Sequence, residues 1–534
     1  MTDRKGPSVN RREFVVGAGA AAGLSTLGIA ASAKAKPKRG GTLRFATRVD
    51  GRGLDPQRNT VYYVSNPMAA TTQGLLDINE KMEIVPGVAE SWEASKDLKT
   101  YTFKLRKGTE YHNGRSIDAE SVKWNFERIL DPKIGHPFTR AALKEVEKIE
   151  VLDKATVRVT LNAQSGVFPA NVIYYPCNLI APDSADQADT HPIGCGPFKF
   201  KSWKRYAKTE MVRFENYYET DADGNRLPYL DAIEGYPKKE DKVRLTALRA
   251  GEVDLIENMA YSDVAAFKKE YGAEYNTWPA PQVGTAMMML NCKSGPFAMS
   301  HPDSKLLRQA VAHAIDREAI HAAIFNELGY KIHGNYSEAS PWYMPGIKNV
   351  KEYDPEKSKA ILRKLNAKGI EIEVVARDTY EYMRQSGELV HAMLTDVGFK
   401  ATNNIFDNPV LRQKYKKADF SVDSTAWSYR FEPDGWFSRG ILSTSPETQL
   451  RTGYKNEKAD KLIIEARNQT DKAKRLELYT EVESIVNDDC PVIYTHAVPL
   501  TSAGTKKLKG YKPAFAGPFS IAHGGIRTAY FDES

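Results

Sequence analysis

The segment that most constrains the fold spans residues 88–128 and predicts a strand, a tight turn and a helix in direct succession. Tyr101, Phe103 and Leu105 alternate with polar residues, and this period of two is typical of a strand with one buried face. The Asn-Gly pair at residues 113–114 tolerates positive φ angles, so it favours a turn after the strand. A strand of this kind must pack its apolar face against another apolar surface.

The helix expected after this turn can supply that surface. Val122, Phe126 and Ile129 recur at intervals of four and three residues, which places them on one helical stripe away from the charged residues. His112 has no second His, Cys or carboxylate at the spacing of metal ligands, so we interpret it as a structural turn residue. The segment therefore predicts a packed strand and helix, and it contains no catalytic group.

Four short motifs within this segment resemble a known family. An A-E-S-W motif, a Y-T-F-x-L-R-x-G motif, a turn similar to F-H-D-G and a helix start similar to A-E-D-V occur in this order at residues 89–92, 101–108, 112–114 and 119–122. The series resembles the peptide, opine and nickel binding family of extracellular solute-binding proteins, family 5, which serve ABC importers. The resemblance implies an α/β fold of two lobes, the clam-shell arrangement of class II or cluster C binding proteins, with mixed sheets and two hinge crossovers. It also implies that the chain captures a solute for a permease and is not an enzyme.

The first residues predict export from the cytoplasm. Residues 10–16, with the sequence N-R-R-E-F-V-V, match the twin-arginine pattern, and a stretch rich in Gly and Ala follows up to residue 33. We expect the Tat translocase to export the chain to the periplasm and a signal peptidase to cleave it near residues 33–35, where small residues occur. A permanent membrane anchor is the alternative, because the stretch is about long enough to span a bilayer.

The length of the remaining chain predicts two lobes rather than one core. After a signal peptide of residues 1–39, we expect residues 40–285 and 500–534 to form lobe I and residues 286–499 to form lobe II. One long helix is expected over residues 302–325, at the start of lobe II. The two chain crossovers between the lobes would then form the hinge.

Short-range patterns predict two helix caps and one disulfide. Asp354 precedes Pro355, and Asp471 precedes a run with helical spacing, so both aspartates are expected to cap helices. Four cysteines in an oxidising compartment are able to form disulfides, and Cys177 with Cys195 is the pair nearest in sequence.

Two blocks of the predicted second lobe resemble segments that hold the ligand in relatives. The V-A-R segment that ends at Arg377 resembles one whose arginine binds a peptide carboxylate, unless Arg377 pairs with an acid within residues 378–381. The block that begins at Trp427 resembles one that, in peptide-binding relatives, carries an aspartate for the peptide amino group. This chain has Arg430 at that place, or Tyr429 if a gap is allowed, and neither is acidic.

We therefore expect a small ligand with one or more carboxylates, such as an opine, an acidic amino-acid conjugate or an N-blocked peptide. Arginine forks bind carboxylates through charge-assisted hydrogen bonds, whereas a free ammonium would meet a like charge at Arg430. Tyr62 and Tyr63, after the first strand, are further candidates for the wall of the ligand site.

An ordinary di- or oligopeptide is the alternative ligand. This alternative holds if Arg430 faces solvent or pairs with Glu432 or Asp434, because Asp423 or Glu432 can then accept a peptide amine. Trp427 likewise has a second interpretation, as a residue of the core.

The sequence contains no pattern typical of an enzyme, a metal centre or nucleic-acid binding. No H-x-x-x-H, C-x-x-C or G-x-S-x-G motif occurs, and the glycine-rich stretch similar to a dinucleotide site lies in the signal peptide. We expect no cofactor, no metal and no nucleic acid. The predicted partners of a monomer are a small-molecule solute, the ABC permease subunits and, during export, the Tat translocase. Nickel binding, haem binding and a sensory role are alternatives.

Overall fold

The computed structural model describes residues 37–48, 50–51, 53–59, 69–79, 82–513 and 525–532, which belong to one compact unit. The predicted signal peptide, except residues 37–39, and the candidates Tyr62 and Tyr63 lie outside the described residues. None of the helices in the described ranges is long and apolar enough to span a membrane.

A mixed sheet of 11 strands runs through this unit. Its order is β15 (Lys400–Phe406), β14 (Glu371–Arg377), β16 (Val422–Ser428), β12 (Tyr275–Leu290), β17 (Val492–Thr505), β11 (Leu255–Ile256), β1 (Thr42–Thr47), β10 (Ala232–Pro237), β9 (Lys208–Arg213) and β8 (Phe198–Lys204), and β13 (Tyr330–Lys331) pairs with β17 outside this path. β14 runs parallel to β15 and β16, whereas β12 is antiparallel to β16 and β17. The predicted α/β class with mixed sheets is confirmed.

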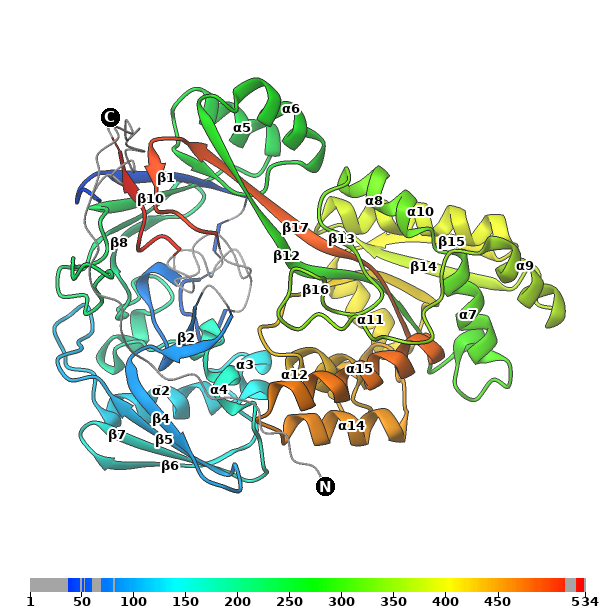
Figure 1. The fold of residues 1–534 in the computed structure, drawn as a ribbon, viewed down its shortest axis with the longest axis horizontal. Coiled ribbons are helices and arrows are strands. Elements are labelled where there is room, and N and C mark those ends of the chain that lie inside the picture. The colour runs from blue at the N-terminus through cyan, green and yellow to red at the C-terminus, as the bar shows by residue number, and fades with distance from the viewer. Residues whose placement is uncertain are drawn as a thin grey trace, which may run out of the picture. The chain divides into compact units, whose positions relative to one another are not determined.

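Two long strands, β12 and β17, connect the two ends of this sheet (Figure 1). They pair antiparallel from Tyr275 opposite Thr505 onward, and the register shifts between Ala280 and Gly284. Such a shift is expected here because Pro281 cannot donate to the ladder. We call the elements from β1 to α6 the N-terminal region and those from α7 to α15 the central region.

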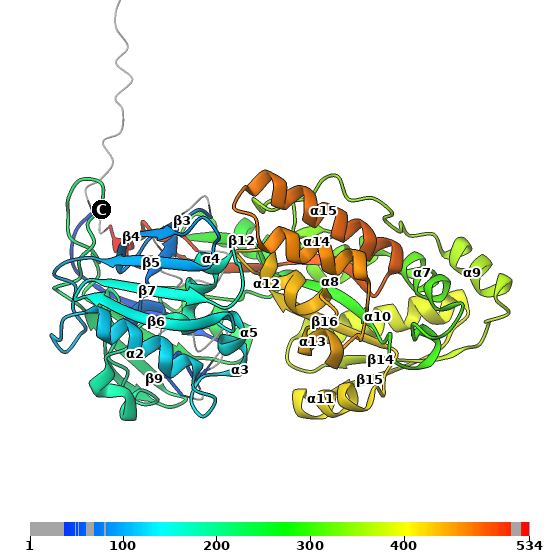
Figure 2. The ribbon, with the colours of Figure 1, turned by 90° about the horizontal axis from the view of Figure 1, so that it is seen from below.

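The N-terminal region contains the predicted strand and helix. Its four-stranded antiparallel sheet has the order β4 (Ala89–Ala94), β5 (Thr100–Leu105), β7 (Thr156–Leu161) and β6 (Val146–Asp153). Helix α2 (Ala119–Leu130) lies beside this sheet, at the end of the unit opposite to α7, α9 and α10 (Figure 2).

The apolar faces of β5 and α2 share one core, as predicted. Tyr101, Phe103, Val122 and Phe126 are buried in one core. Gly114 adopts a φ of 83°, which is the positive angle that the predicted turn requires.

The other elements of the N-terminal region surround these sheets. They are β2 (Leu76–Ile78), β3 (Ile84–Pro86), α3 (Pro137–Ala142), α4 (Phe168–Val172), η1 (Tyr175–Cys177), η2 (Pro182–Gln187), α5 (Asp241–Arg249) and α6 (Tyr261–Tyr271). The C-terminal strands β18 (Leu508–Lys509) and β19 (Tyr530–Phe531) pair with each other.

In the central region, helices cover both faces of the sheet. Met288 of β12 packs with α7 (Ser304–Ala314), α8 (Arg317–Phe325), α9 (Pro355–Lys364) and α10 (Glu381–Val397) in one core. Met287 points to the opposite face and packs with α14 (Glu457–Arg467) and α15 (Lys472–Asp489) in another. The short turn η3 (Gly295–Phe297) precedes α7. Between α10 and α14 in the sequence lie α11 (Asn408–Lys417), α12 (Asp434–Trp436), the π-helical turn η4 (Phe437–Ile441) and α13 (Pro446–Leu450).

Both predicted aspartate caps are confirmed, but the predicted long helix is wrong. Asp354 and Asp471 accept hydrogen bonds from the backbone N–H groups of the first turns of α9 and α15. Residues 302–325 form two helices, α7 and α8, because Ile315 is extended and the Asp316 side chain caps a new helix by accepting from Ala319 N at 3.0 Å.

The predicted disulfide between Cys177 and Cys195 is not formed, and all four cysteines are buried free thiols. The Cys177 thiol donates to the Asn171 carbonyl at 3.5 Å and the Cys195 thiol to the Gln73 carbonyl at 3.6 Å. Burial raises the pKa of both thiols to about 12. The short separation of the two cysteines in sequence therefore did not predict a disulfide, because each thiol is directed at a different backbone carbonyl.

Candidate functional site

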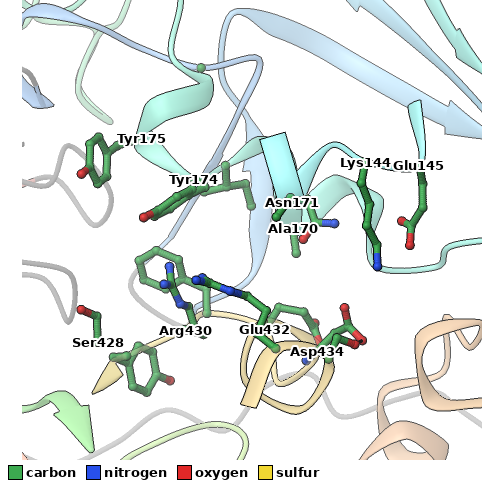
Figure 3. A pocket seen from close by; sticks show the side chains of 18 of the residues that line it. Lys144, Glu145, Ala170, Asn171, Tyr174, Tyr175, Ser428, Arg430, Glu432 and Asp434 are labelled. Atoms are coloured by element: carbon green, nitrogen blue, oxygen red, sulfur yellow. Dashed lines mark hydrogen bonds between the residues drawn. The ribbon is translucent and has the colours of Figure 1, made fainter. Parts of the chain in front are cut away.

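A cavity of about 550 Å³ lies between the N-terminal and central regions (Figure 3). The N-terminal wall includes α3, α4 and the tyrosines that follow α4, Tyr174 and Tyr175. The central wall includes the segment after β16, the turn η4, the start of α13 and the last residue of α14, Arg467. We call this space the first cavity.

The backbone after β16 fixes Arg430 at the wall of the first cavity. The Tyr429 N–H donates to the Val283 carbonyl at 2.9 Å, and the Tyr336 hydroxyl donates to the Arg430 carbonyl at 3.1 Å. The Arg430 side chain packs against Gly435, where an added Cβ would lie only 3.2 Å from its Cβ and Cγ. This support lets the guanidinium cross to the N-terminal wall, where it lies over the Tyr174 ring with 5.0 Å to the centroid (Figure 3).

The acidic side chains that line the first cavity already have basic partners. These ion pairs are Asp77 with Arg527, Glu145 and Asp434 with Arg467, Glu432 with Arg475, and Glu447 with Arg451. Arg430, by contrast, has no acidic partner within 4 Å in the described part of the chain, and its Nε is buried without a hydrogen bond. The two alternative partners predicted for it, Glu432 and Asp434, are bound elsewhere.

Arg439 brings a second guanidinium to the same wall. It extends from η4 and lies over the Trp427 ring, 5.4 Å from the centroid. Burial lowers the pKa of Arg439 to about 10, and repulsion from Arg430 contributes to this shift. The side chain is still cationic at neutral pH, so Arg439 adds to the positive charge that Arg430 and Lys144 bring to this cavity.

No sequence pattern predicted Arg439 as a site residue. It lies in a π-helical turn, where side-chain directions depart from the helical spacing on which sequence patterns depend. No motif marks this position, so the sequence offered no usable signal.

The structure separates the predicted site residues. Tyr429 lines the first cavity, and its hydroxyl shares a hydrogen bond of 2.9 Å with Ser340. Trp427 is buried beneath Arg439 and lines a second cavity. Arg377 lines neither cavity, and it donates to the Tyr415 hydroxyl at 2.9 Å. Tyr62 and Tyr63 lie outside the described residues.

Arg377 pairs with an acid that the sequence analysis did not consider for it. Its NH2 group lies 3.9 Å from Asp423, not beside the acids at 378 or 381. Burial acts to lower the pKa of Arg377, but the charge of Asp423 and the Tyr415 hydroxyl outweigh burial and raise it. Its role in ligand binding stays a prediction.

A second cavity, of about 410 Å³, lies beside β12 and β17, and Ser428 lines both this cavity and the first. Arg48, Tyr261, Tyr380 and Tyr382 are among its lining residues. Arg48 follows β1 and lies over the Tyr380 ring, 5.7 Å from the centroid.

The two regions also contact each other directly beside the first cavity. Arg467 of α14 reaches Glu145 of the N-terminal region at 3.3 Å, and its carbonyl accepts from Gly166 N at 2.8 Å. A Cβ on Gly166 would lie 2.4 Å from the Gln469 carbonyl oxygen, so the close approach requires glycine.

Within the described residues, no group of three or more His, Cys, Asp or Glu side chains could hold a metal ion. His112, interpreted as structural, donates a 2.9 Å hydrogen bond from Nε2 to the Gly196 carbonyl and packs edge-on against Phe214. Burial lowers the pKa of His112 to about 4.

Two curated relatives match most of this chain. It is 28% identical over 507 residues to di/tripeptide-binding protein 1 of Pseudomonas aeruginosa (strain UCBPP-PA14), which covers 88% of this chain and 91% of that protein. It is 27% identical over 498 residues to heme-binding protein A of Haemophilus influenzae, with 87% and 86% covered.

Solved structures share the fold along almost the whole chain. DppA from Helicobacter pylori, in complex with the peptide STSA, has a TM-score of 0.79 at 23% identity, with 93% of this chain and 99% of that chain covered. The A. tumefaciens R10 protein AgaA, in complex with agropinic acid, has a TM-score of 0.77 at 25% identity, with 92% and 99% covered. The neighbours are two-lobed binding proteins, so the predicted fold class is confirmed.

Residues 83–449 match the family described as bacterial extracellular solute-binding proteins, family 5. The match covers more than half of the chain and agrees with the motifs identified in residues 88–128. The chain therefore belongs to family 5 of the bacterial extracellular solute-binding proteins, the periplasmic binding components of ABC importers.

Proposed function

We propose that this protein captures a small solute that bears at least one carboxylate, encloses it between two lobes and delivers it to an ABC permease. An opine, an acidic amino-acid conjugate or an N-blocked peptide fits this description. The protein would act as a monomer without cofactor and without chemical turnover. It would reach the periplasm through the Tat pathway, after cleavage near residues 33–35.

The observation that carries this proposal is the charge of the first cavity. Its acidic side chains are already bound by arginines, whereas Arg430 lies at the wall without an acidic partner in the described chain. Arg439 adds a second cation to the same wall. Two guanidinium groups enclosed at low dielectric favour an anion, and each charge-assisted hydrogen bond contributes about 1.5–3 kcal/mol.

A free di- or oligopeptide is the second candidate, supported by the similarity to a di/tripeptide-binding protein. Its ammonium group would need an acid. Glu432 would have to leave Arg475, and Asp423 would have to leave Arg451 and the Tyr415 hydroxyl. Leaving a buried arginine without its acid is costly, so an acidic or N-blocked ligand fits the first cavity better.

The proposed movement uses β12 and β17. We propose that lobe I comprises residues 40–285 and 500–534, that lobe II comprises residues 286–499, and that the chain bends where the two strands cross between them. The register shift between Ala280 and Gly284 supports a hinge at this place, because a bulge interrupts the ladder of hydrogen bonds.

The experiment that tests this function is identification of the solute that copurifies with the periplasmic protein. The protein is denatured, and the released small molecules are identified by mass spectrometry. Calorimetry then compares the identified acid with its carboxamide, which keeps the shape and removes the charge. We expect the acid to bind at least tenfold more tightly. Equal binding of acid and amide, tighter binding of free peptides, or a stoichiometric metal or haem would contradict the proposal.

A further inference from the structure

We propose that the solute carries two acidic groups held apart from each other, one in each cavity. This inference rests on the proposed function and deepens it, because it specifies the number and the placement of the charges on the ligand. It depends on Arg48 in the second cavity as much as on Arg430 in the first.

The two arginines reach across the space between the regions in opposite directions. Arg430 extends from the central region and lies over Tyr174 of the N-terminal region, 5.0 Å from the ring centroid. Arg48 extends from the N-terminal region and lies over Tyr380 of the central region, 5.7 Å from the ring centroid. Each pair therefore joins the two regions, and each places a guanidinium at a cavity wall.

Arg48 resembles Arg430 in its lack of an acid. The acidic side chains that line the second cavity are Asp241, which pairs with Arg244 at 2.5 Å, and Glu381, which binds Arg384 through both carboxylate oxygens. No carboxylate lies within 4 Å of Arg48 in the ranges that the structure describes. Arg48 is thus a cation of the second cavity that acts on Glu381 at a distance but forms no ion pair within the described ranges.

The two cavities are neighbours and can hold parts of one molecule. Ser428, the last residue of β16, lines both of them and is exposed. Their volumes, about 550 and 410 Å³, together suit a ligand of small-peptide size. Such a ligand would pass the Ser428 side chain and present one end to each arginine.

Charge balance explains why both ends should be acidic. When the regions enclose a ligand, Arg48 and Arg430 lose water, and an unpaired charge in a closed space is unfavourable. A ligand with one carboxylate supplies an anion to one cavity and leaves the arginine of the other cavity without one. A ligand with two separated carboxylates supplies an anion to each cavity, so the site selects for diacids against monoacids.

The test uses matched synthetic acids as probes. N-glutaryl-L-alanine has a carboxylate at each end, whereas N-pentanoyl-L-alanine has nearly the same length and only one. The N-succinyl and N-adipoyl analogues vary the distance between the charges. In calorimetry with the full mature protein, we expect one of the diacids to bind at least tenfold more tightly than the monoacid.

Variants then assign each carboxylate to an arginine. Arg48→Gln and Arg430→Gln are each expected to lower the affinity for the best diacid by roughly tenfold or more, while only one of the two lowers the affinity for the monoacid. Arg48→Lys should restore part of the affinity, because it keeps the charge but not the planar fork. Arg205→Gln is the matched control, because Arg205 also lies over a tyrosine, Tyr206 at 5.0 Å, but lines neither cavity.

The inference is overturned if the monoacid binds as tightly as every diacid, or if Arg48→Gln leaves diacid affinity unchanged while its thermal unfolding matches the wild type. A copurified solute with a single acidic group would also overturn it. In those cases the proposed function still stands if Arg430→Gln weakens the monoacid. If the solute has no acidic group and none of the acids binds, both proposals fail.

Discussion

Arg377 and Arg430 are two arginines of the central region that the sequence predicts as ligand-binding residues, and their surroundings differ. Arg377 is the last residue of β14, lies 3.9 Å from Asp423 and donates to the Tyr415 hydroxyl. Arg430 lies just beyond the end of β16, has no acidic partner within the described chain and lies over a tyrosine of the other region. The first is part of a closed network, whereas the second faces a cavity.

The difference arises from strand pairing rather than from the arginines themselves. The register of β14 and β16 sets Val375 beside Asp423, which places a carboxylate close to Arg377. The acids nearest to Arg430 in sequence, Glu432 and Asp434, are bound by Arg475 and Arg467 of later helices. An arginine therefore becomes available to a ligand when distant parts of the chain take its nearby acids.

The largest expected effect comes from breaking the closed network. Asp423→Asn removes the charge that Arg377 and Arg451 share but keeps an oxygen for the Tyr415 hydroxyl. Because two buried arginines then lack a counter-charge, we expect the free energy of unfolding to fall by about 3–5 kcal/mol, measured by urea denaturation. Solute affinity should stay within about threefold of the wild type. Weaker binding at unchanged stability would instead support the sequence prediction that Arg377 binds ligand.

At Arg430 we expect the reverse, a large loss of affinity with little change in stability. Arg430→Asp should weaken an acidic solute by roughly 10- to 100-fold in calorimetry, because a charge-assisted bond becomes a repulsion. It should also favour binding of free peptides, whose ammonium group then meets an acid. The free energy of unfolding should change by less than about 1 kcal/mol, since the substitution removes little more than the cation–π interaction with Tyr174. Unchanged affinity for the acid would remove Arg430 from the site.

The parts of the fold that the sequence predicted correctly depend on residues close together in the chain. The strand before residue 105, the turn at Gly114 and the caps Asp354 and Asp471 follow from periodicity, positive φ and side-chain hydrogen bonds within one turn. The break between α7 and α8 is also local, and Asp316 was its overlooked signal.

The parts that could not be predicted depend on long-range pairing. β12 begins at Tyr275 and continues through the two prolines at 279 and 281, because pairing with β17 overrides their low strand propensity. The same limit applies to the candidate site. The sequence presented Arg377 and Arg430 as similar candidates, and only the register of β16 and the positions of α14 and α15 distinguish them.

Within the described residues, Glu483 is a buried acid without an arginine partner, and it can be compared with Asp423. Glu483 of α15 is fully buried, accepts from Asn335 N at 2.9 Å through Oε1, and lies beside the Tyr494 hydroxyl. Burial raises the pKa of Glu483 from 4.5 to about 8. Asp423, equally buried, has two arginines instead.

This contrast predicts a pH dependence of stability. Between pH 4.5 and about 8, Glu483 is protonated in the folded chain and ionised in the unfolded chain, so the unfolded state binds fewer protons. The free energy of unfolding should therefore fall as pH rises through this range, by up to about 1.4 kcal/mol per unit from this group. Glu483→Gln should remove that slope in urea denaturation from pH 5 to 8. The exposed Glu481→Gln is the control, and identical slopes for wild type and Glu483→Gln would contradict the prediction.

The smallest change in solute affinity is expected at the site of Arg467, which pairs with two acids. Arg467 binds Glu145 across the two regions and Asp434 within its own, so Glu145→Gln leaves it one partner. We expect solute affinity to fall by about three- to tenfold, mainly through faster release, because the substitution removes one ion pair that holds the regions together.

Burial raises the pKa of Glu145, so acidification should weaken the same ion pair in the wild type and have less effect in the variant. Stopped-flow release rates at two pH values, with the exposed Glu147→Gln as control, measure this. Equal rates in all three proteins would show that the ion pair does not contribute to retention of the solute.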